Sequence, residues 1–374
     1  MRRYLWTIFL VFTIFITGCS TEKGDTQDEQ NAGNQTDVIN IIASGNMPPK
    51  QGYMVGYHFP WMDRVEEETN GRVKFERYTS AELVPSGGEI TALETGTIDL
   101  ALSGLRSYHP DLFPMADIGS LPVIGTDAVM MTKAYIDLLE SDVVLKDGKT
   151  YYQLEIEDKG FVAMPMPALT PYQISTSKKQ LINPEDFKGV LLRAGSRANE
   201  LFVINIGGTP VTMVAPELYD AMSRGTIDGT AFSIADWQGY GFQDILRYTI
   251  LGVDLGTYVG DNLVLKETWE SWPQDIRDIM MAIAKDQAIK GAEYWNSLIE
   301  PTIKLAEDKG AVFKDYKDLS AETQQLLANA ITKTWYDWID KVTADGAPGL
   351  ECARLWRDLL IKHGAQVPDE IMDL

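Results

Sequence analysis

The tetrapeptide Gly-Thr-Ile-Asp occurs twice in this sequence, at residues 96–99 and at residues 225–228. In both copies an alanine lies four residues before the glycine, after a run of mixed apolar and polar residues. Helices often end on glycine, since it adopts a left-handed backbone conformation at little steric cost. We interpret each copy as the end of a helix followed by a buried strand. Four matching residues can recur by coincidence, but the shared context favours two α/β units of similar plan.

The chain is long and apolar enough to bury the cores of two such units. It has 374 residues, of which 45% are hydrophobic. Short β-branched or alternating runs predict strands, and apolar residues at helical spacing predict helices. The strands are expected at residues 38–44, 72–78, 97–103, 173–177, 190–193 and 262–266, with strand-like patches over 151–164. The helices are expected at 54–70, 89–95, 128–140, 199–206, 269–292, 294–309, 323–342 and 352–363.

The proline-rich segment 164–171 is predicted to cross between two lobes, because proline does not continue a helix or a central strand. The pattern therefore indicates a two-lobe α/β fold with a helical C-terminal tail. The expected division is a lipoprotein signal at 1–19, a disordered tether at 20–37, lobe I at 38–168 and 258–300, and lobe II at 169–257 and 301–374 with the C-terminal helices.

The N-terminus has the pattern of an export signal. Arg2 and Arg3 precede a short apolar run at residues 5–16, which is too short to span a bilayer. The residues that follow, Thr17-Gly18-Cys19, resemble a bacterial lipobox, in which the cysteine is lipidated. An ordinary secretory signal is the alternative. We expect Cys19 to carry a lipid that anchors an extracytoplasmic protein to a membrane, which leaves Cys352 as a lone buried thiol.

Several function classes are disfavoured by composition and by missing motifs. The net charge of −21 opposes nucleic-acid binding, which depends on neutralising phosphates. The sequence has no Gly-x-Ser-x-Gly motif, no phosphate-binding loop and no Cys-x-x-Cys pair, and its three histidines are widely spaced. We therefore expect no cofactor, no metal site and no enzymatic activity. A hydrolase built from scattered carboxylates leaves no local signature and stays open.

Arg193 is the residue whose setting most suggests a binding role. It ends a short apolar strand and precedes Ala194-Gly195. Open α/β sheets bind ligands at the carboxyl ends of their strands. A guanidinium matches a carboxylate through two parallel hydrogen bonds. A surface salt bridge is the alternative for this residue taken alone.

The surrounding motifs resemble the substrate-binding proteins of tripartite ATP-independent periplasmic (TRAP) transporters, in the dicarboxylate-binding-protein family. The resemblance covers roughly residues 38–292. Its motifs are Pro184-Glu185-Asp186-Phe187-Lys188-Gly189-Val190 with Arg193, Gly207-Gly208-x-Pro210, Pro216-Glu217-Leu218-Tyr219 with Gly225-Thr226-Ile227-Asp228-Gly229, the first Gly-Thr-Ile-Asp copy, and Trp269-Glu270-Ser271-Trp272-Pro273. It implies a periplasmic-binding-protein-like fold with a hinge and a cleft between the lobes. It further implies that the cleft closes on an organic acid, held by Arg193, for delivery to TRAP permease membrane subunits.

Departures from the family's patterns bear on the ligand. Phe232 stands where sialic-acid-binding members have asparagine, and Tyr172 and Gln173 occupy the zone of their additional arginine. Ala231-Phe232 replaces the Glu-Trp pair of keto-acid-binding members, which disfavours a metal-bridged ligand without settling whether a metal assists. We therefore expect a less polar ligand, an aromatic or branched monocarboxylate.

The remaining ligand-binding candidates are Ala215 and aromatic residues near the predicted cleft loops. Packing in a lobe core is the alternative for each aromatic ring. Besides Ala215 they are Tyr53 and Trp237, with Tyr57, Trp61, Tyr108 and Tyr258 as further rings that would wall the cleft. Two alternatives to a TRAP-linked binder also stay open. One is the binding component of another importer or a sensor, and the other is a surface enzyme acting on a carboxylate substrate.

Overall fold

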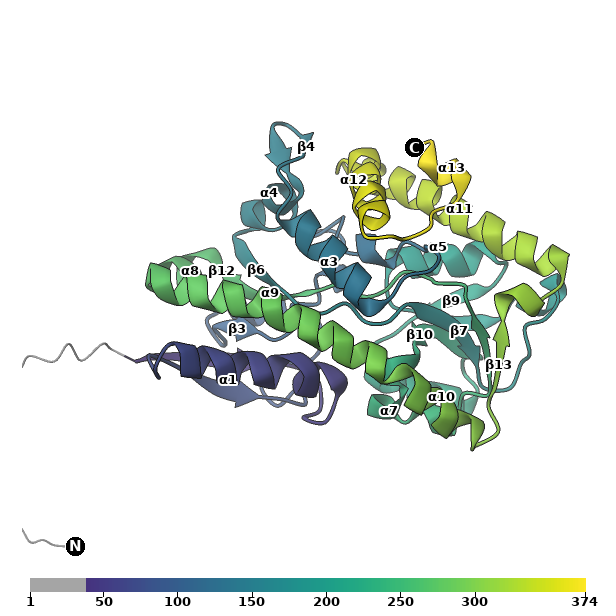
Figure 1. The fold of residues 1–374 in the computed structure, drawn as a ribbon, viewed down its shortest axis with the longest axis horizontal. Helices are drawn as coiled ribbons and strands as arrows, with labels where there is room; N and C mark the ends of the chain where they lie inside the picture. The colour runs from purple at the N-terminus through teal and green to yellow at the C-terminus, as the bar shows by residue number, and fades with distance from the viewer. Residues whose placement is uncertain (1–37) are drawn as a thin grey trace, which may run out of the picture. The chain divides into compact units, whose positions relative to one another are not determined.

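The computed structural model describes residues 38–374 (Figure 1). Residues 1–37 lie outside the described residues, and with them the predicted signal sequence, Cys19 and the predicted tether at 20–37. Over residues 38–374, none of the helices combines the length and the apolar character needed to cross a membrane.

A five-stranded sheet contains the N-terminal strands of the described chain. Its order is β2-β1-β3-β12-β6, with β1 parallel to both β2 and β3, and β12 antiparallel to β3 and β6. The parallel core therefore comes from the N-terminal segment, while one strand returns from far along the chain. The strands are β1 (Ile39–Ser44), β2 (Val73–Tyr78), β3 (Leu100–Ala101), β6 (Phe161–Pro165) and β12 (Asp261–Leu265).

A six-stranded sheet is formed by the middle of the chain, in the order β13-β11-β7-β10-β8-β9. The chain passes from the first sheet to the second between β6 and β7, returns between β11 and β12, and passes back between β12 and β13. Its strands are β7 (Tyr172–Thr176), β8 (Leu191–Ala194), β9 (Thr209–Thr212), β10 (Gly229–Ser233), β11 (Tyr248–Leu251) and β13 (Val312–Asp315), and a separate hairpin pairs β4 (Val144–Lys146) with β5 (Lys149–Thr150).

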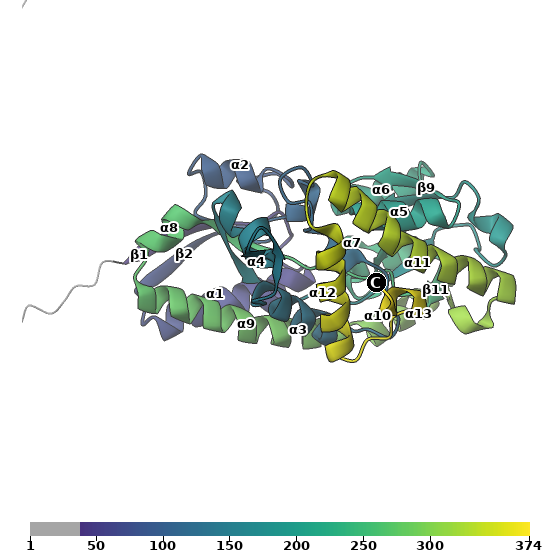
Figure 2. The ribbon, with the colours of Figure 1, turned by 90° about the horizontal axis from the view of Figure 1, so that it is seen from above.

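Helices cover both sheets (Figures 1 and 2). The long helix α9 packs against α1, α3 and β6 and also against α10, while α11 packs on α5 and α12 packs on both α3 and α11. A π-helix (Met54–His58) leads into α1. The α-helices are α1 (Phe59–Glu68), α2 (Glu89–Glu94), α3 (Ala128–Leu139), α4 (Tyr151–Glu155), α5 (Arg197–Asn205), α6 (Leu218–Arg224), α7 (Trp237–Tyr240), α8 (Lys266–Ser271), α9 (Gln274–Ser297), α10 (Ile299–Glu307), α11 (Ala321–Ala344), α12 (Gly349–Lys362) and α13 (Asp369–Met372).

The two Gly-Thr-Ile-Asp copies end equivalent helices, as predicted. Gly96 follows α2 with φ of 67°, and Gly225 follows α6 with φ of 72°. The amide that follows each glycine donates to the carbonyl of the alanine four residues before it, over 2.9 Å from Thr97 and 3.0 Å from Thr226. These left-handed glycines with backward hydrogen bonds form Schellman-type helix ends.

The aspartate of each copy fixes the strand that follows to its parallel neighbour. The Asp99 carboxylate accepts from the amide of Ile42 at 2.8 Å, and that of Asp228 accepts from the amide of Leu191 at 2.9 Å. The Asp99 and Asp228 amides donate back to the same two residues, at 3.0 and 2.8 Å. The repeated sequence therefore performs the same structural task in both sheets, where β3 pairs with β1 and β10 with β8.

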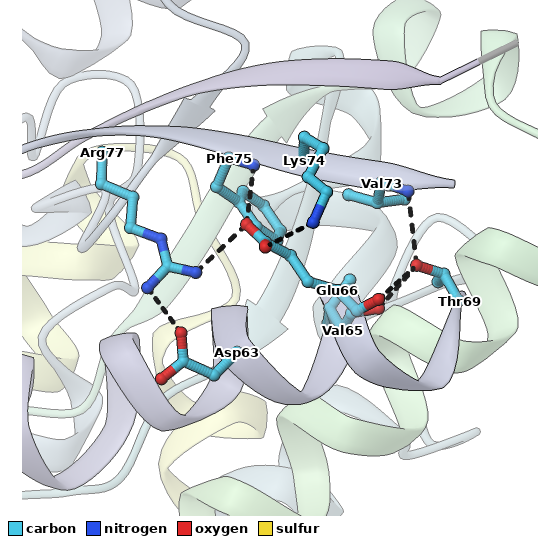
Figure 3. A network of polar contacts seen from close by, with 8 residues as sticks. All are labelled: Asp63, Val65, Glu66, Thr69, Val73, Lys74, Phe75 and Arg77. Atoms are coloured by element: carbon cyan, nitrogen blue, oxygen red, sulfur yellow. Dashed lines mark hydrogen bonds and ion pairs between the residues drawn. The ribbon is translucent and has the colours of Figure 1, made fainter. Parts of the chain in front are cut away.

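Helix α1 is joined to the edge strand β2 by a polar network (Figure 3). The Glu66 carboxylate accepts from the amide of Phe75, from the Lys74 ammonium and from the Arg77 guanidinium, each at 3.1 Å. Asp63 pairs with Arg77 at 2.6 Å. The Phe75 amide points away from β1, and its hydrogen bond to Glu66 gives it a partner at the open edge of the sheet. The network therefore also protects this edge from pairing with another strand.

Two secondary-structure expectations were wrong, and one strand was not predicted. Residues 151–155 form helix α4 instead of a strand-like patch, because Thr150 and Gln153 make a capping box at its start. The expected strand over 97–103 is reduced to the two residues of β3. The strand that was not predicted is β13, which lies between the predicted helices at 294–309 and 323–342 and extends the second sheet by pairing with β11. The crossing at the proline-rich segment is confirmed, although Pro165 ends the edge strand β6, where proline is tolerated.

The buried apolar residues form a large and a small cluster. The large cluster includes the buried residues of α9, α11 and α12 and contains the buried free thiol of Cys352, as predicted. The small cluster lies against the second sheet and is centred on Trp237, Phe242 and Phe232. The two-sheet arrangement brings strand ends from both sheets toward the cavity described next. The predicted lobe boundaries themselves stay a prediction.

Candidate functional site

A cavity of about 90 Å³ lies where connections from both sheets meet. A single water needs about 10–15 Å³ measured in this way, so the space suits a small molecule. Segments that follow β1, β3, β8, β9 and β10 line it, and these are carboxyl ends of parallel strands, where α/β sheets place their ligand sites. From the five-stranded sheet's side come Met47, Gln51, Tyr53 and Ser103, and from the six-stranded sheet's side come Tyr172, Arg193, Asn199, Ala215, Phe232, Asp236 and Tyr240.

Arg193 extends from β8 into this cavity and is only 3% exposed. Its Nε donates to the carbonyl of Met213 at 3.1 Å, which fixes the direction of the side chain. The guanidinium carbon lies 5.6 Å from the centre of the Phe232 ring, in cation–π contact. On another side it lies against the backbone of Gly195, since a Cβ there would be 2.5 Å from Nη1. Glycine at 195 therefore makes room for the guanidinium.

The guanidinium of Arg193 has no acidic partner among residues 38–374, and its two Nη groups make no hydrogen bond there. Arg106 provides the contrast, because it is equally buried but pairs with Asp261 at 2.7 Å and lies 3.6 Å from Glu155. An uncompensated buried charge is costly, by several kcal/mol. The site is therefore suited to an anion that enters from solution.

Asn199 adds a second unpaired polar group to the cavity lining. It lies in the first turns of α5, which Ser196 caps by accepting from the Asn199 amide at 3.2 Å. The side chain is 2% exposed, and neither its Nδ2 nor its Oδ1 has a partner within the described chain. The sequence reasoning missed this residue. The sequence did offer one signal for Asn199. Asparagine is a poor helix former, and this one lies inside the predicted helix only six positions after Arg193.

Aromatic rings form much of the cavity wall. Tyr172 stacks on Phe232 with ring centres 5.6 Å apart, and Tyr240 meets Phe232 edge-on at 5.8 Å. Tyr53 and Tyr258 meet edge-on at 6.4 Å on the side of the other sheet. Such surfaces favour a planar or apolar ligand body over a polyhydroxylated one.

Another part of the wall is polar and was not predicted. Asp236 is 3% exposed and accepts from the Gln51 side-chain amide through Oδ1 at 3.0 Å. The Gln51 amide is oriented in turn, because its Oε1 accepts from the Tyr53 backbone amide at 2.7 Å. Burial raises the pKa of the Asp236 carboxyl well above its usual range, against the lowering effect of the Gln51 hydrogen bond. A buried carboxyl group that is held in place therefore faces the ligand space.

The predicted site residues divide into two groups by position. Tyr53, Tyr172, Arg193, Ala215 and Phe232 line the cavity, as do the additional rings of Tyr108 and Tyr258. Their roles in ligand binding stay predictions.

Gln173 and Trp237 are not part of the cavity lining. Gln173 follows Tyr172 in β7, so its side chain points to the opposite face of the sheet and donates to Asp254 at 2.9 Å. Trp237 is fully buried in the small cluster and stacks on Phe313 at 5.8 Å. Tyr57 and Trp61 are also core residues, bonded to the carbonyls of Pro165 and Met280.

Across the described range, 38–374, no group of three or more His, Cys, Asp or Glu side chains is arranged to hold a metal ion. The ionisable groups that line the cavity are Arg193, Asp236 and tyrosines, whose side chains can donate or accept hydrogen bonds. The chemistry of the site is therefore that of a hydrogen-bonding cavity around one cationic group.

Two α/β units with a mostly apolar cavity at their strand ends, and one unpaired buried cation inside it, define the class of two-lobe solute-binding proteins. The sequence matches the family described as bacterial extracellular solute-binding protein, family 7, over residues 46–340. The chain belongs to that family.

Curated relatives cover most of the chain at low identity. A solute-binding protein of Albidiferax ferrireducens is 26% identical over 298 residues, which are 78% of this chain and 81% of the relative. The C4-dicarboxylate-binding periplasmic protein DctP of Rhodobacter capsulatus is 23% identical over 295 residues, covering 77% of this chain and 83% of the relative.

Solved structures of TRAP solute-binding proteins share the fold. One from Rhodoferax ferrireducens, in complex with copurified benzoate, has a TM-score of 0.74 at 21% identity and covers 87% of this chain and 98% of its own. One from an unidentified marine microbe, specific for aromatic acid ligands and bound to metahydroxyphenylacetate, has a TM-score of 0.76 at 21% identity and covers 87% and 99%. The predicted two-lobe fold with its helical C-terminal segment is confirmed.

Proposed function

We propose that this protein captures a small organic acid by its carboxylate and delivers it to a TRAP-type membrane permease. The observation that carries the proposal is the Arg193 guanidinium, buried at 3% exposure with both Nη groups unpaired within the described chain. An incoming carboxylate supplies the missing counter-charge and accepts two parallel hydrogen bonds. Asn199 lines the same cavity, and the unpaired amide of its side chain is available to donate to the acid group.

The energies are sufficient for capture at micromolar concentration, which requires about 8 kcal/mol. Two charge-assisted hydrogen bonds from Arg193 contribute about 3–6 kcal/mol, taking about 1.5–3 kcal/mol for each. The aromatic wall contributes the rest, at about 25 cal/mol for each Å² of apolar surface that is removed from water.

The wall also supports a ligand class, an aromatic or branched monocarboxylic acid. Tyr172, Phe232 and Tyr240 present ring surfaces beside Arg193, where a sugar acid would require more polar groups. The similar structures that hold benzoate, metahydroxyphenylacetate or mandelate bind acids of this kind. We propose that no metal takes part, since Ala231 stands at the position of the glutamate with which keto-acid-binding members hold a metal.

We further propose that the mature protein starts at a lipidated Cys19 and is held at the outer face of a membrane by a tether at 20–37. The proposed lobes are 38–168 with 258–300, and 169–257 with 301–374. The exchange of β12 and β13 between the sheets supports this division, because each strand joins the sheet of its proposed lobe. Labelling of the full chain with radioactive palmitate tests the anchor, and Cys19→Ser should abolish both the label and the recovery in membranes.

Calorimetric titration with benzoate, phenylacetate, mandelate, 2-oxoisovalerate and succinate tests the binding function. We expect micromolar binding of at least one aromatic or branched monocarboxylate, and a loss of at least about a hundredfold in Arg193→Ala and Arg193→Lys, from two hydrogen bonds of about 1.5 kcal/mol each. Arg224→Ala, at a highly exposed guanidinium outside the cavity, is the matched control and should leave affinity unchanged. Retained affinity in Arg193→Ala contradicts the proposal, and so does consumption of the bound acid in a turnover assay.

A further inference from the structure

The Asp236 carboxyl group is a second polar feature of the cavity, and carboxylate binding by Arg193 does not use it. It ends the short turn at residues 234–236 that follows β10, and its Oδ1 accepts from Gln51 at 3.0 Å. Its other oxygen, Oδ2, makes no hydrogen bond within residues 38–374. Gln51 comes from the segment after β1, so the contact joins the connections of the two sheets and fixes the carboxyl group in the cavity wall.

Two tyrosines are placed near this carboxyl group by the local structure. Tyr240 ends helix α7, which begins directly after Asp236, and the Tyr53 backbone amide donates to the Gln51 side chain that holds Asp236. Burial and the neighbouring Asp236 raise the pKa of Tyr240 well above its usual range, so the hydroxyl keeps its proton. No hydrogen bond to it occurs in the described part of the chain, although the ring is fixed by stacking on Phe242 at 5.4 Å. The Tyr53 hydroxyl is buried and likewise unpaired within residues 38–374, with its ring packed edge-on against Trp295 at 5.1 Å. Buried hydroxyls are rarely left without a partner.

This polar end is separate from Arg193. Arg193 forms neither an ion pair nor a hydrogen bond with Asp236, whose Oδ1 accepts from Gln51 instead. The Phe232 ring contacts both sides, since its centre lies 5.6 Å from the Arg193 guanidinium carbon and 5.8 Å from the centre of the Tyr240 ring. The cavity thus has a cationic end, an aromatic middle and a hydroxyl-and-carboxyl end.

We propose that Asp236 and the Tyr240 hydroxyl form a second subsite that binds a hydroxyl group of the ligand, so that the substrate is a hydroxylated aromatic acid. The inference rests on the proposed function, since the acid group is placed by Arg193. A hydroxyl both accepts one hydrogen bond and donates another. It accepts from Tyr240 and donates to Oδ2 of Asp236, while its ring lies against Tyr172 and Phe232. Gln51 positions the carboxyl group by donating to Oδ1.

The test compares matched acids on the wild-type protein by calorimetry. Phenylacetate, 3-hydroxyphenylacetate, 4-hydroxyphenylacetate and 3-aminophenylacetate share one carboxylate and differ only at the ring. We expect one hydroxylated acid to bind about tenfold tighter than phenylacetate, from net hydrogen-bond contributions of about this size. Tyr240→Phe and Asp236→Asn should each remove most of that preference and change the phenylacetate affinity less than about threefold. In Asp236→Asn the amide oxygen keeps the Gln51 bond, which places a donor where Oδ2 accepted.

Tyr57→Phe is the control for loss of a tyrosine hydroxyl, because that hydroxyl donates to the Pro165 carbonyl in the core at 2.7 Å. It should lower the melting temperature and leave the hydroxyl preference intact. Tyr240→Phe removes a single oxygen atom, so the test remains available if Asp236→Asn does not fold. Phenylacetate binding that depends on Arg193, with no gain from any ring hydroxyl, overturns the subsite and leaves the proposed function standing. A larger gain for the amine also overturns it. Binding of none of the four acids overturns the subsite as well, whereas the proposed function fails only if the wider acid panel also shows no binding that depends on Arg193.

Discussion

Gly195→Ala should abolish acid binding without unfolding the protein, because the added methyl group competes with the Arg193 guanidinium for the same space. The new Cβ would lie 2.5 Å from Nη1 and 2.6 Å from the guanidinium carbon. These atoms are the far end of a flexible side chain, so they move and the backbone does not. Position 195 is also not in the left-handed region, so alanine adopts the existing conformation without strain.

The magnitude follows from what the displaced guanidinium loses. Two charge-assisted hydrogen bonds of about 1.5–3 kcal/mol each amount to about 3–6 kcal/mol, or between about a hundredfold and ten-thousandfold in the dissociation constant. The free energy of unfolding without ligand should stay level or rise by about 0.4–1 kcal/mol, since alanine restricts the unfolded chain. Calorimetric titration measures the first quantity and urea unfolding the second.

Gly208→Ala provides the opposite phenotype as a control. Its Cβ would contact Val203 at 3.0 Å and Val190 at 3.1 Å, in packing that does not line the cavity. This variant should lose stability and keep its affinity. If Gly195→Ala binds the acid within about threefold of the wild-type protein, a change of under about 0.7 kcal/mol, the guanidinium does not hold the ligand from its observed position, and the reasoning about Arg193 is refuted.

Three further outcomes are expected. Asn199→Ala should weaken acid binding by about tenfold in calorimetry, from the loss of one hydrogen bond, and an unchanged affinity would remove Asn199 from the site. Arg106→Met should cost about 3–5 kcal/mol in urea unfolding while a folded fraction keeps its affinity, because it leaves the Asp261 and Glu155 carboxyls without their cation. Burial lowers the pKa of His58 to about 3 in the folded protein. In the unfolded chain the imidazole has its ordinary pKa of about 6.5, so below that pH it binds a proton that the folded protein does not bind. Stability present above pH 6.5 is then lost on acidification, by about 1.4 kcal/mol between pH 7.5 and 5.5, and His58→Leu should lack this component of the pH dependence.

Local backbone chemistry made parts of the fold predictable. Gly96 and Gly225 end helices for a reason contained within a few residues, namely a left-handed conformation followed by a backward hydrogen bond. Arg193 was found in the same way, from its place at a strand's end and from the motifs around it. The pairing of Asp99 and Asp228 with amides of neighbouring strands depends on contacts distant in sequence, so the pattern showed a repeat but not its task.

Other features depended on orientation and on distant partners. Tyr172 and Gln173 are adjacent in β7, and only the phase of the strand decides which one faces the cavity. For Trp237 the sequence indicated burial, and a core and a cavity wall bury an indole equally well. Asp236 had no motif at all, because its significance comes from Gln51, which lies far away in the chain. The short strand β13 was missed because it exists only by pairing with β11.

The length of α9 limits how far the two sheets can swing apart. The helix has 24 residues and touches β6 of one sheet as well as the turn that follows β10 of the other. It is about 36 Å long at 1.5 Å per residue, and intact helices curve with radii of about 60–100 Å, so it accommodates a bend of roughly 20–35°. A larger opening between the sheets requires α9 to unwind locally or to lose its contacts with one of the two sheets. Amide hydrogen exchange along α9 would then become faster at that point in the unloaded protein and slow again when the cavity is filled.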